Sequence, residues 1–118
     1  MQTKYIVKQN DTRDCGICCL ESIIKYYNGY IPLEILRLDT NTNNNGTTAY
    51  NLIKTAKKYG FNALGKRINK LNEKEIILPA IAHITTKKGL NHFVVIYKIN
   101  KNTVTIMDPA KGFIKLKK

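Results

Sequence analysis

Apolar residues recur every three or four positions in the first half of the chain, which is the spacing of one face of an α-helix. This pattern predicts a first helix from about Asp14 to Tyr27, ending at Asn28-Gly29. A short second helix is expected from Pro32 to Leu38, and a third from Thr48 to Tyr59. The stripes of the first and third helices are Cys19, Leu20, Ile23, Ile24, Tyr27, Ala49, Leu52, Ile53 and Ala56.

The second half changes to extended apolar runs. Residues 61–67 are predicted to form a strand and residues 72–77 a helical turn. Three longer strands and a short edge strand are then expected at Pro79–Thr85, His92–Ile99, Thr103–Asp108 and Phe113–Leu116. Helices first and strands afterwards predict an α+β domain in which a mostly antiparallel sheet backs the helices. The polar run 40–46 is interpreted as a surface loop.

Composition bounds the class of protein. A chain of 118 residues with 43% hydrophobic residues forms one domain, residues 1–118, and is too apolar to be disordered. It has neither a signal peptide nor a long enough apolar stretch to span a membrane, so the isolated domain is expected to be soluble. The net charge of +12 favours either an acidic partner or a plain solvated surface. No zinc-finger, helix-turn-helix or RNA-binding signature accompanies it, so no nucleic-acid partner is expected.

Three cysteines, Cys15, Cys18 and Cys19, crowd into five residues, which favours a reduced, intracellular chain over a disulfide scaffold. Cys15 falls at the first turn of the first helix, where backbone N–H groups and the helix dipole stabilise a thiolate. Gln9 could add its amide to the Cys15 N–H as an oxyanion hole, and Gly16 would let a substrate approach. The alternative is that Cys15 is a small buried hydrophobe and Gln9 an ordinary loop residue.

His92 and Asp108 lie on two strands that a loop at 100–102 connects. A three-residue loop pairs Ile99 with Thr103 and sets Asp108 opposite Val94. His92 and Asp108 are then diagonal neighbours on one face, roughly 7–8 Å apart along the backbone and within reach of a hydrogen bond. The same register puts four apolar residues on that face, predicted to pack on the first helix: Val94, Ile96, Val104 and Ile106.

Cys15, His92 and Asp108 together form a candidate Cys-His-Asp triad. In such a triad the thiolate attacks, the imidazolium protonates the leaving amine and the acid orients the ring. Taken singly, His92 could be a satisfied strand histidine, and Asp108 with the following proline an ordinary turn.

Three motifs carry a resemblance to a known family: QNDTRDCG, PAIAHITTKKGLNHFVVIYKI and VTIMDPAKG. Together they resemble the double-glycine leader peptidases, the N-terminal cysteine-peptidase domains of bacteriocin- and peptide-exporting ABC transporters, from about Tyr5 to Phe113. The resemblance implies a papain-like fold, with Cys15 as nucleophile, His92 as acid/base, Asp108 as orienting group and Gln9 in the oxyanion hole. It implies no cofactor or metal.

The resemblance also implies a substrate, a partner and a location. The family cleaves precursor peptides after a Gly-Gly or Gly-Ala pair that ends an amphipathic, often acidic leader helix. Cleavage is coupled to export by the transmembrane and ATPase domains of the transporter, on the cytoplasmic side of the membrane. This chain departs from the family at Asn91, where Gly is more usual, and at Cys18 and Cys19, where small or apolar residues are common. It also ends soon after Gly112, as either an excised domain or a stand-alone protein.

Three alternatives to the peptidase stay open at this point. One is a non-catalytic module that binds leader peptides, and a second is a basic nucleic-acid binder. The third is a zinc site formed by Cys15, Cys18, Cys19, His83 and His92, although adjacent cysteines on a helix point apart. His83 lies in an apolar strand and is interpreted as structural.

Overall fold

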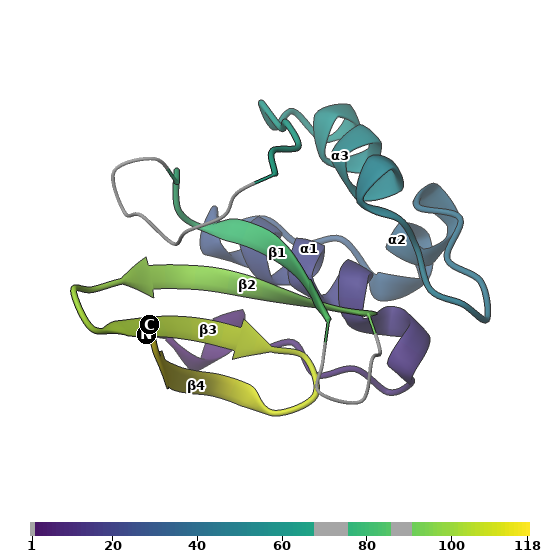
Figure 1. Ribbon diagram of the computed structural model, residues 1–118. Helices are drawn as coiled ribbons and strands as arrows, with labels where there is room; N and C mark the ends of the chain where they lie inside the picture. The colour runs from purple at the N-terminus through teal and green to yellow at the C-terminus, as the bar shows by residue number, and fades with distance from the viewer. Residues whose placement is uncertain (1, 68–75, 86–90) are drawn as a thin grey trace.

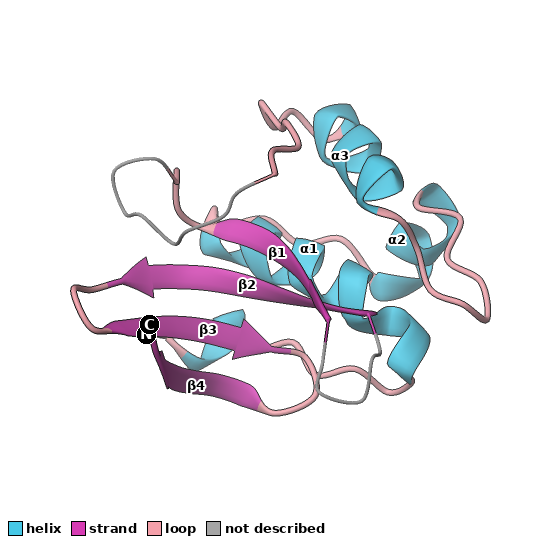
Figure 2. Ribbon diagram, viewed as in Figure 1, coloured by secondary structure: helices cyan, strands magenta, loops and turns pink. Residues whose placement is uncertain are grey.

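Short helices lead into a sheet along the part of the chain that the computed structural model describes, residues 2–67, 76–85 and 91–118. Figure 2 shows this division, with the helices contributed by the N-terminal half and the strands by the C-terminal half. The elements, in chain order, are the 3-10 turns η1 (Thr3–Tyr5) and η2 (Thr12–Asp14), the helices α1 (Cys15–Tyr26), α2 (Leu33–Asp39) and α3 (Ala49–Lys58), and the strands β1 (Ala80–Thr85), β2 (Asn91–Ile99), β3 (Thr103–Asp108) and β4 (Gly112–Lys117). The predicted α+β class is confirmed.

The four strands form an antiparallel sheet in the order β1-β2-β3-β4, in which each strand pairs with the next in sequence. Figure 1 shows α1 behind this sheet, with α2 and α3 grouped at one side of the molecule. Among the helices, α1 makes the main packing contact with the sheet, on β2, and it also contacts α2 and α3. This arrangement makes α1 the element through which the helices are held against the sheet.

The main core lies between α1 and the sheet face that carries Phe93, Val95, Tyr97 and Met107. The prediction that Val94, Ile96, Val104 and Ile106 pack on the first helix is therefore wrong. Those four residues form a second cluster on the opposite face, with Ile99, Leu78 and other apolar side chains. The error arises because β2 and β3 are apolar on both faces, so alternation does not distinguish the side that α1 covers.

The β2–β3 hairpin contains a β-bulge that the sequence did not reveal. Near the loop, Ile99 pairs with Val104, not with Thr103 as predicted. The register shifts between Ile96 and Lys98, and beyond it Val95 pairs with Met107, as the predicted register requires. One extra residue in β2 thus restores the expected pairing before the strands reach His92 and Asp108.

Helix ends follow the local sequence. Thr48 caps α3 by accepting a hydrogen bond from the Asn51 N–H at 3.1 Å, and Gly60 ends that segment with a φ of +95°. The predicted strand at 61–67 is wrong, because these residues alternate in burial at first but pair with no described strand. Most of the predicted turn at 72–77 lies outside the described residues. Within the described ranges, no helix has the length and apolar character needed to cross a membrane.

Candidate active site

Cys15 is the first residue of α1 and is 7% exposed. The residue before it, Asp14, is buried and binds Arg37 of α2 through two hydrogen bonds, of 3.1 Å from Nε and 2.8 Å from an Nη. This bidentate pair ties the start of α1 to α2 and balances a carboxylate next to the thiol. The N-terminus of the helix that carries Cys15 is therefore fixed in place by a charge pair as well as by apolar packing.

His92 and Asp108 are hydrogen-bonded, with 2.7 Å between His92 Nε2 and Asp108 Oδ1. Their side chains are 15% and 12% exposed. The same Oδ1 accepts a hydrogen bond from the Ala110 N–H at 2.9 Å, which holds the carboxylate in position. The prediction that the hairpin brings these two residues together is confirmed. Because Nε2 is engaged by the acid, Nδ1 is left as the ring nitrogen available for proton transfer.

Cys15 lies close to the strand that carries His92. Its sulfur is within hydrogen-bonding range of the backbone of Phe93, the residue after His92. The negative charge of Asp108 also acts on the thiol and raises its pKa. Burial raises the pKa of the thiol above its ordinary value of 9.0, and backbone hydrogen bonds at Phe93, Gly16 and Cys15 itself offset this only in part. The sequence-based expectation of a stabilised thiolate is thus modified, because desolvation outweighs the helix N-terminus in the free domain.

Gln9 lies beside the same group of residues. Its backbone N–H donates to the carbonyl of Pro109 at 2.9 Å, so the segment that enters η2 is held against the end of β3. The side-chain Oε1 is buried and has no hydrogen-bond partner among the described residues. A buried amide oxygen without a partner is an acceptor, so the group that would satisfy it is a donor such as an N–H of a bound ligand.

A cavity of about 310 Å³ opens at Cys15. Its described lining is Thr12, Cys15, Asn45, Gly46, Thr47, Thr48, Ala49, His83 and Phe93. Gly16 lies behind the lining, because a Cβ there would be 2.8 Å from a methyl of Thr47 and 3.3 Å from the ring of Phe93. The prediction that Gly16 admits the substrate is therefore wrong: the missing side chain lets α1 pack tightly behind the cavity.

Two parts of this lining were not recognised in the sequence. His83, interpreted there as structural, is exposed, and its ring stacks on Phe93 in the cavity wall. Residues 45–49, at and after the end of the predicted surface loop, form another part of the lining. The pairing of β1 with β2 places His83 beside Phe93, and the fold of the chain at 45–49 places that segment in the lining. Neither arrangement can be recognised from a local sequence pattern.

The remaining cysteines are core residues. Cys18 and Cys19 are both 0% exposed, and burial raises the pKa of Cys18 to about 12. Among the residues that the structure describes, no group of three His, Cys, Asp or Glu side chains is placed to hold a metal ion. The zinc alternative thus gains no support from the described side chains.

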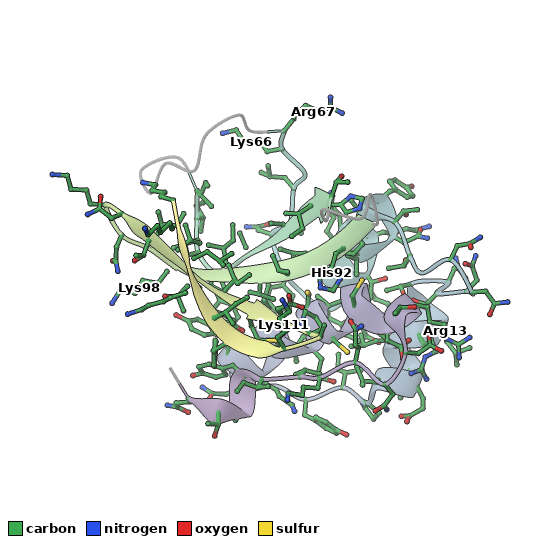
Figure 3. The ribbon with its side chains drawn as sticks, turned by 60° about the horizontal axis from the view of Figure 1, so that its bottom comes forward. Arg13, Lys66, Arg67, His92, Lys98 and Lys111 are labelled. Carbon is green, nitrogen blue, oxygen red and sulfur yellow. The ribbon has the colours of Figure 1, made fainter. Side chains whose placement is uncertain are left out.

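Basic side chains are spread over several elements. Figure 3 shows Lys66 and Arg67 on the segment after α3, Lys98 at the end of β2 away from His92, and Arg13 in η2. Lys111 lies between β3 and β4, on the side of the molecule that carries His92. Among the described residues, the positive charge is therefore carried by several elements and not by one.

In the papain-like cysteine peptidases, a helix that carries a cysteine precedes an antiparallel sheet that carries a histidine and an acid. The chain has this fold. Within that class, it belongs to the Peptidase C39 family, whose model matches residues 3–118.

Relatives in this family are processing and transport proteins. The chain is 40% identical over 114 residues to the lactococcin-G-processing and transport ATP-binding protein of Lactococcus lactis subsp. lactis, covering 95% of this chain and 16% of that protein. It is 37% identical over 108 residues to the pediocin PA-1 transport/processing ATP-binding protein of Pediococcus acidilactici, covering 90% of this chain and 15% of that protein. The chain thus spans about one-sixth of the length of these relatives.

Solved structures show the same fold. A double glycine motif protease from an AMS/PCAT transporter, in complex with the leader peptide, superposes with a TM-score of 0.82 at 32% identity, covering 95% of this chain and 78% of that one. The peptidase domain of Streptococcus ComA, a bi-functional ABC transporter involved in quorum sensing, gives a TM-score of 0.79 at 33% identity, covering 95% and 85%.

Proposed function

We propose that the chain is a cysteine endopeptidase that cleaves the leader of a precursor peptide after a Gly-Gly or Gly-Ala pair. The observation that carries the proposal is the 2.7 Å hydrogen bond between His92 and Asp108 at the strand next to Cys15. Membership of the Peptidase C39 family and the likeness to a double glycine motif protease support it.

In the proposed reaction, Cys15 is the nucleophile and His92 moves the protons. Burial raises the pKa of the thiol and so disfavours a free thiolate, and His92 Nδ1 takes the thiol proton as the sulfur attacks the scissile carbonyl. The imidazolium that forms beside Asp108 then protonates the leaving amine, and a water molecule releases the acyl group from the sulfur. Asp108 orients the ring through its hydrogen bond with His92.

The oxyanion of the tetrahedral intermediate would be held by two donors, the Cys15 N–H and the Gln9 side-chain amide. The hydrogen bond from the Gln9 backbone N–H to the Pro109 carbonyl, which anchors Gln9 beside Asp108, supports this placement. Donors placed before the reaction stabilise the developing charge without reorganisation.

The proposed substrate and partners follow from the relatives. The precursor would present an amphipathic leader helix whose apolar face docks on the domain, while the two small residues enter the cavity. The transmembrane and ATPase domains of an ABC transporter would then export the remainder, on the cytoplasmic side of the membrane. The names of the two relatives, which join processing to transport, support this context.

The test is incubation of the chain with a panel of double-glycine leader peptides, read by mass spectrometry. We expect one cut after the second residue of the pair, and no cut by Cys15→Ala, which should still bind the peptide. A second candidate, a domain that only binds leaders, is favoured if the wild type binds the peptides but leaves them intact. Cleavage elsewhere in the peptides, or equal cleavage by Cys15→Ala, would contradict the proposal.

A further inference from the structure

The cavity at Cys15 has two walls of different character. The segment 45–49, which ends at the first residue of α3, contributes small or polar side chains and Gly46, which has a φ of +92°. The other wall is formed by His83 of β1 and Phe93 of β2, called here the His83–Phe93 wall. These two residues are direct partners in the antiparallel register, so they lie side by side on one sheet face.

The His83–Phe93 wall is closed. The ring centroids are 4.4 Å apart and the planes are within 17° of parallel, so no substrate atom can pass between the rings. Phe93 is fixed, because it is 5% exposed and belongs to the core under α1. His83 is exposed, so its side chain is not part of the buried core. The surface that it offers to the cavity is the face or edge of a stacked ring.

His83 and Phe93 lie at different distances along the path of a bound peptide. The Cys15 sulfur is at the backbone of Phe93, and His83 lies one strand further away, at the usual interstrand spacing of about 4.8 Å. An extended peptide advances about 3.3 Å per residue. A peptide that crosses from β2 to β1, with its N-terminal side over β1, would place the residue under attack against Phe93 and the residue before it near His83.

We propose that His83 determines specificity at the penultimate residue of the cleavage motif, by closing the cavity wall against any side chain larger than hydrogen. This inference rests on the proposed peptidase function. The wall acts by shape: the ring occupies the space that a Cβ on the penultimate residue would need, and it takes no part in proton transfer. An Ala at that position must displace the ring from Phe93, whereas a Gly needs no adjustment.

Two substitutions at His83 separate shape from imidazole chemistry. His83→Ala removes the ring and opens the wall, whereas His83→Phe keeps a stacked ring of similar size without a titratable nitrogen. Thr85→Ala is the matched control, because Thr85 is exposed on the same strand and the same sheet face, two residues from His83, and is not part of the described lining of the cavity.

The experiment measures kcat/KM on three versions of one leader peptide, with Gly-Gly, Ala-Gly or Gly-Ala at the cleavage site. In the wild type we expect Gly-Gly to be preferred over Ala-Gly. In His83→Ala the ratio of the two should fall by about tenfold or more, with Gly-Gly cleavage retained and the ratio of Gly-Gly to Gly-Ala unchanged. His83→Phe and Thr85→Ala should keep the wild-type ratios.

Several outcomes overturn the inference while leaving the peptidase intact. An unchanged Ala-Gly ratio in His83→Ala shows that the wall does not select, and an equal fall in His83→Phe shows that shape is not the cause. An equal fall for Gly-Ala places His83 at the wrong residue of the motif. Loss of Gly-Gly cleavage in His83→Ala, with an unchanged unfolding temperature, would assign His83 another role. Failure of the wild type to cleave any peptide contradicts the proposed function itself.

Discussion

One oxygen of Asp108 accepts hydrogen bonds both from the His92 ring, at 2.7 Å, and from the Ala110 N–H, at 2.9 Å. The carboxylate is thus held by the backbone of its own turn and in turn holds the imidazole. At the scale of single residues, this makes the orientation of His92 depend on an acceptor atom more than on a charge. The two properties of Asp108 can be separated by substitution.

We expect Asp108→Asn to lower kcat less than His92→Ala does. Asn keeps an oxygen that can accept from both partners, so the ring stays oriented, although the imidazolium loses a stabilising charge. Loss of the acid/base itself costs about 10²–10⁴-fold. The measurement is single-turnover cleavage of a Gly-Gly leader by both variants. Equal and complete losses would contradict the assigned roles.

The Asp14–Arg37 pair predicts a large change in stability. Arg37→Met leaves the carboxylate of Asp14, which is 2% exposed, without its two hydrogen bonds. The free energy of unfolding should fall by about 2–3 kcal/mol, measured by urea denaturation. Lys58→Met is the control, because its ion pair with Asp39 is at the surface and should matter little. If both variants lose the same stability, the Asp14–Arg37 pair does not fix α1.

The four residues proposed as catalytic could be named from the sequence because each lies in a local motif: a helix start, a hairpin or a segment just before the cysteine. His83 could not. Its role depends on its stacking with Phe93, which is set by the pairing of two strands separated by residues 86–90, and no local pattern encodes that register.

At the scale of elements, α1 carries a buried acid. Glu21 is 2% exposed, its Oε1 accepts from the Ile31 N–H at 3.3 Å, and its Oε2 is buried with no partner among the described residues. Burial raises the pKa of this carboxyl above its ordinary value of 4.5, and the Ile31 hydrogen bond and Lys25 oppose the rise. The folded state therefore favours the neutral form of Glu21.

The sign of the pH dependence follows from that shift. A raised pKa in the folded state means that the unfolded chain releases the proton first, so stability is lost as the pH rises from about 4.5 through the folded pKa. Glu21→Gln, which cannot ionise, should gain stability relative to the wild type across this range. The measurement is the difference in unfolding free energy at acidic and neutral pH. A difference that does not depend on pH would contradict the assignment to Glu21.

Most helix and strand bounds could be predicted because the residues that begin or end an element, such as the capping Thr48 and the terminating Gly60, can be recognised from the local sequence. The bulge in β2 could not, since an extra residue in a strand that is apolar on both faces leaves the pattern unchanged. The strand expected at 61–67 failed for a related reason: alternating burial describes a surface-lying segment as well as a strand, and only a partner distinguishes them.

At the scale of the whole molecule, the net charge of +12 is the dominant long-range feature. Among the described residues, basic side chains lie on several elements (Figure 3), so an acidic peptide is attracted to more than one part of the molecule. Its effect is expected on the rate of encounter more than on the lifetime of the complex.

We expect the association rate of an acidic leader with Cys15→Ala to fall by about tenfold or more from low to high salt, with a much smaller change in dissociation rate. Stopped-flow fluorescence of a labelled leader measures both rates. A leader whose acidic residues are replaced by Gln is the control and should show little salt dependence. Salt effects confined to dissociation would instead indicate specific ion pairs in the bound state.

The most direct test of the account is the pH dependence of alkylation of Cys15 by iodoacetamide, with Cys15→Ala as the blank. If His92 takes the thiol proton as the sulfur attacks, the wild type should be alkylated faster than His92→Ala at pH values below 9, where burial disfavours a free thiolate in both proteins. In His92→Ala, burial, the backbone and the charge of Asp108 still act on the thiol, so this variant should react appreciably only above pH 9.0, the ordinary pKa of a cysteine thiol. Superimposable profiles for the two proteins would show that His92 does not act on Cys15, and the peptidase mechanism would be contradicted.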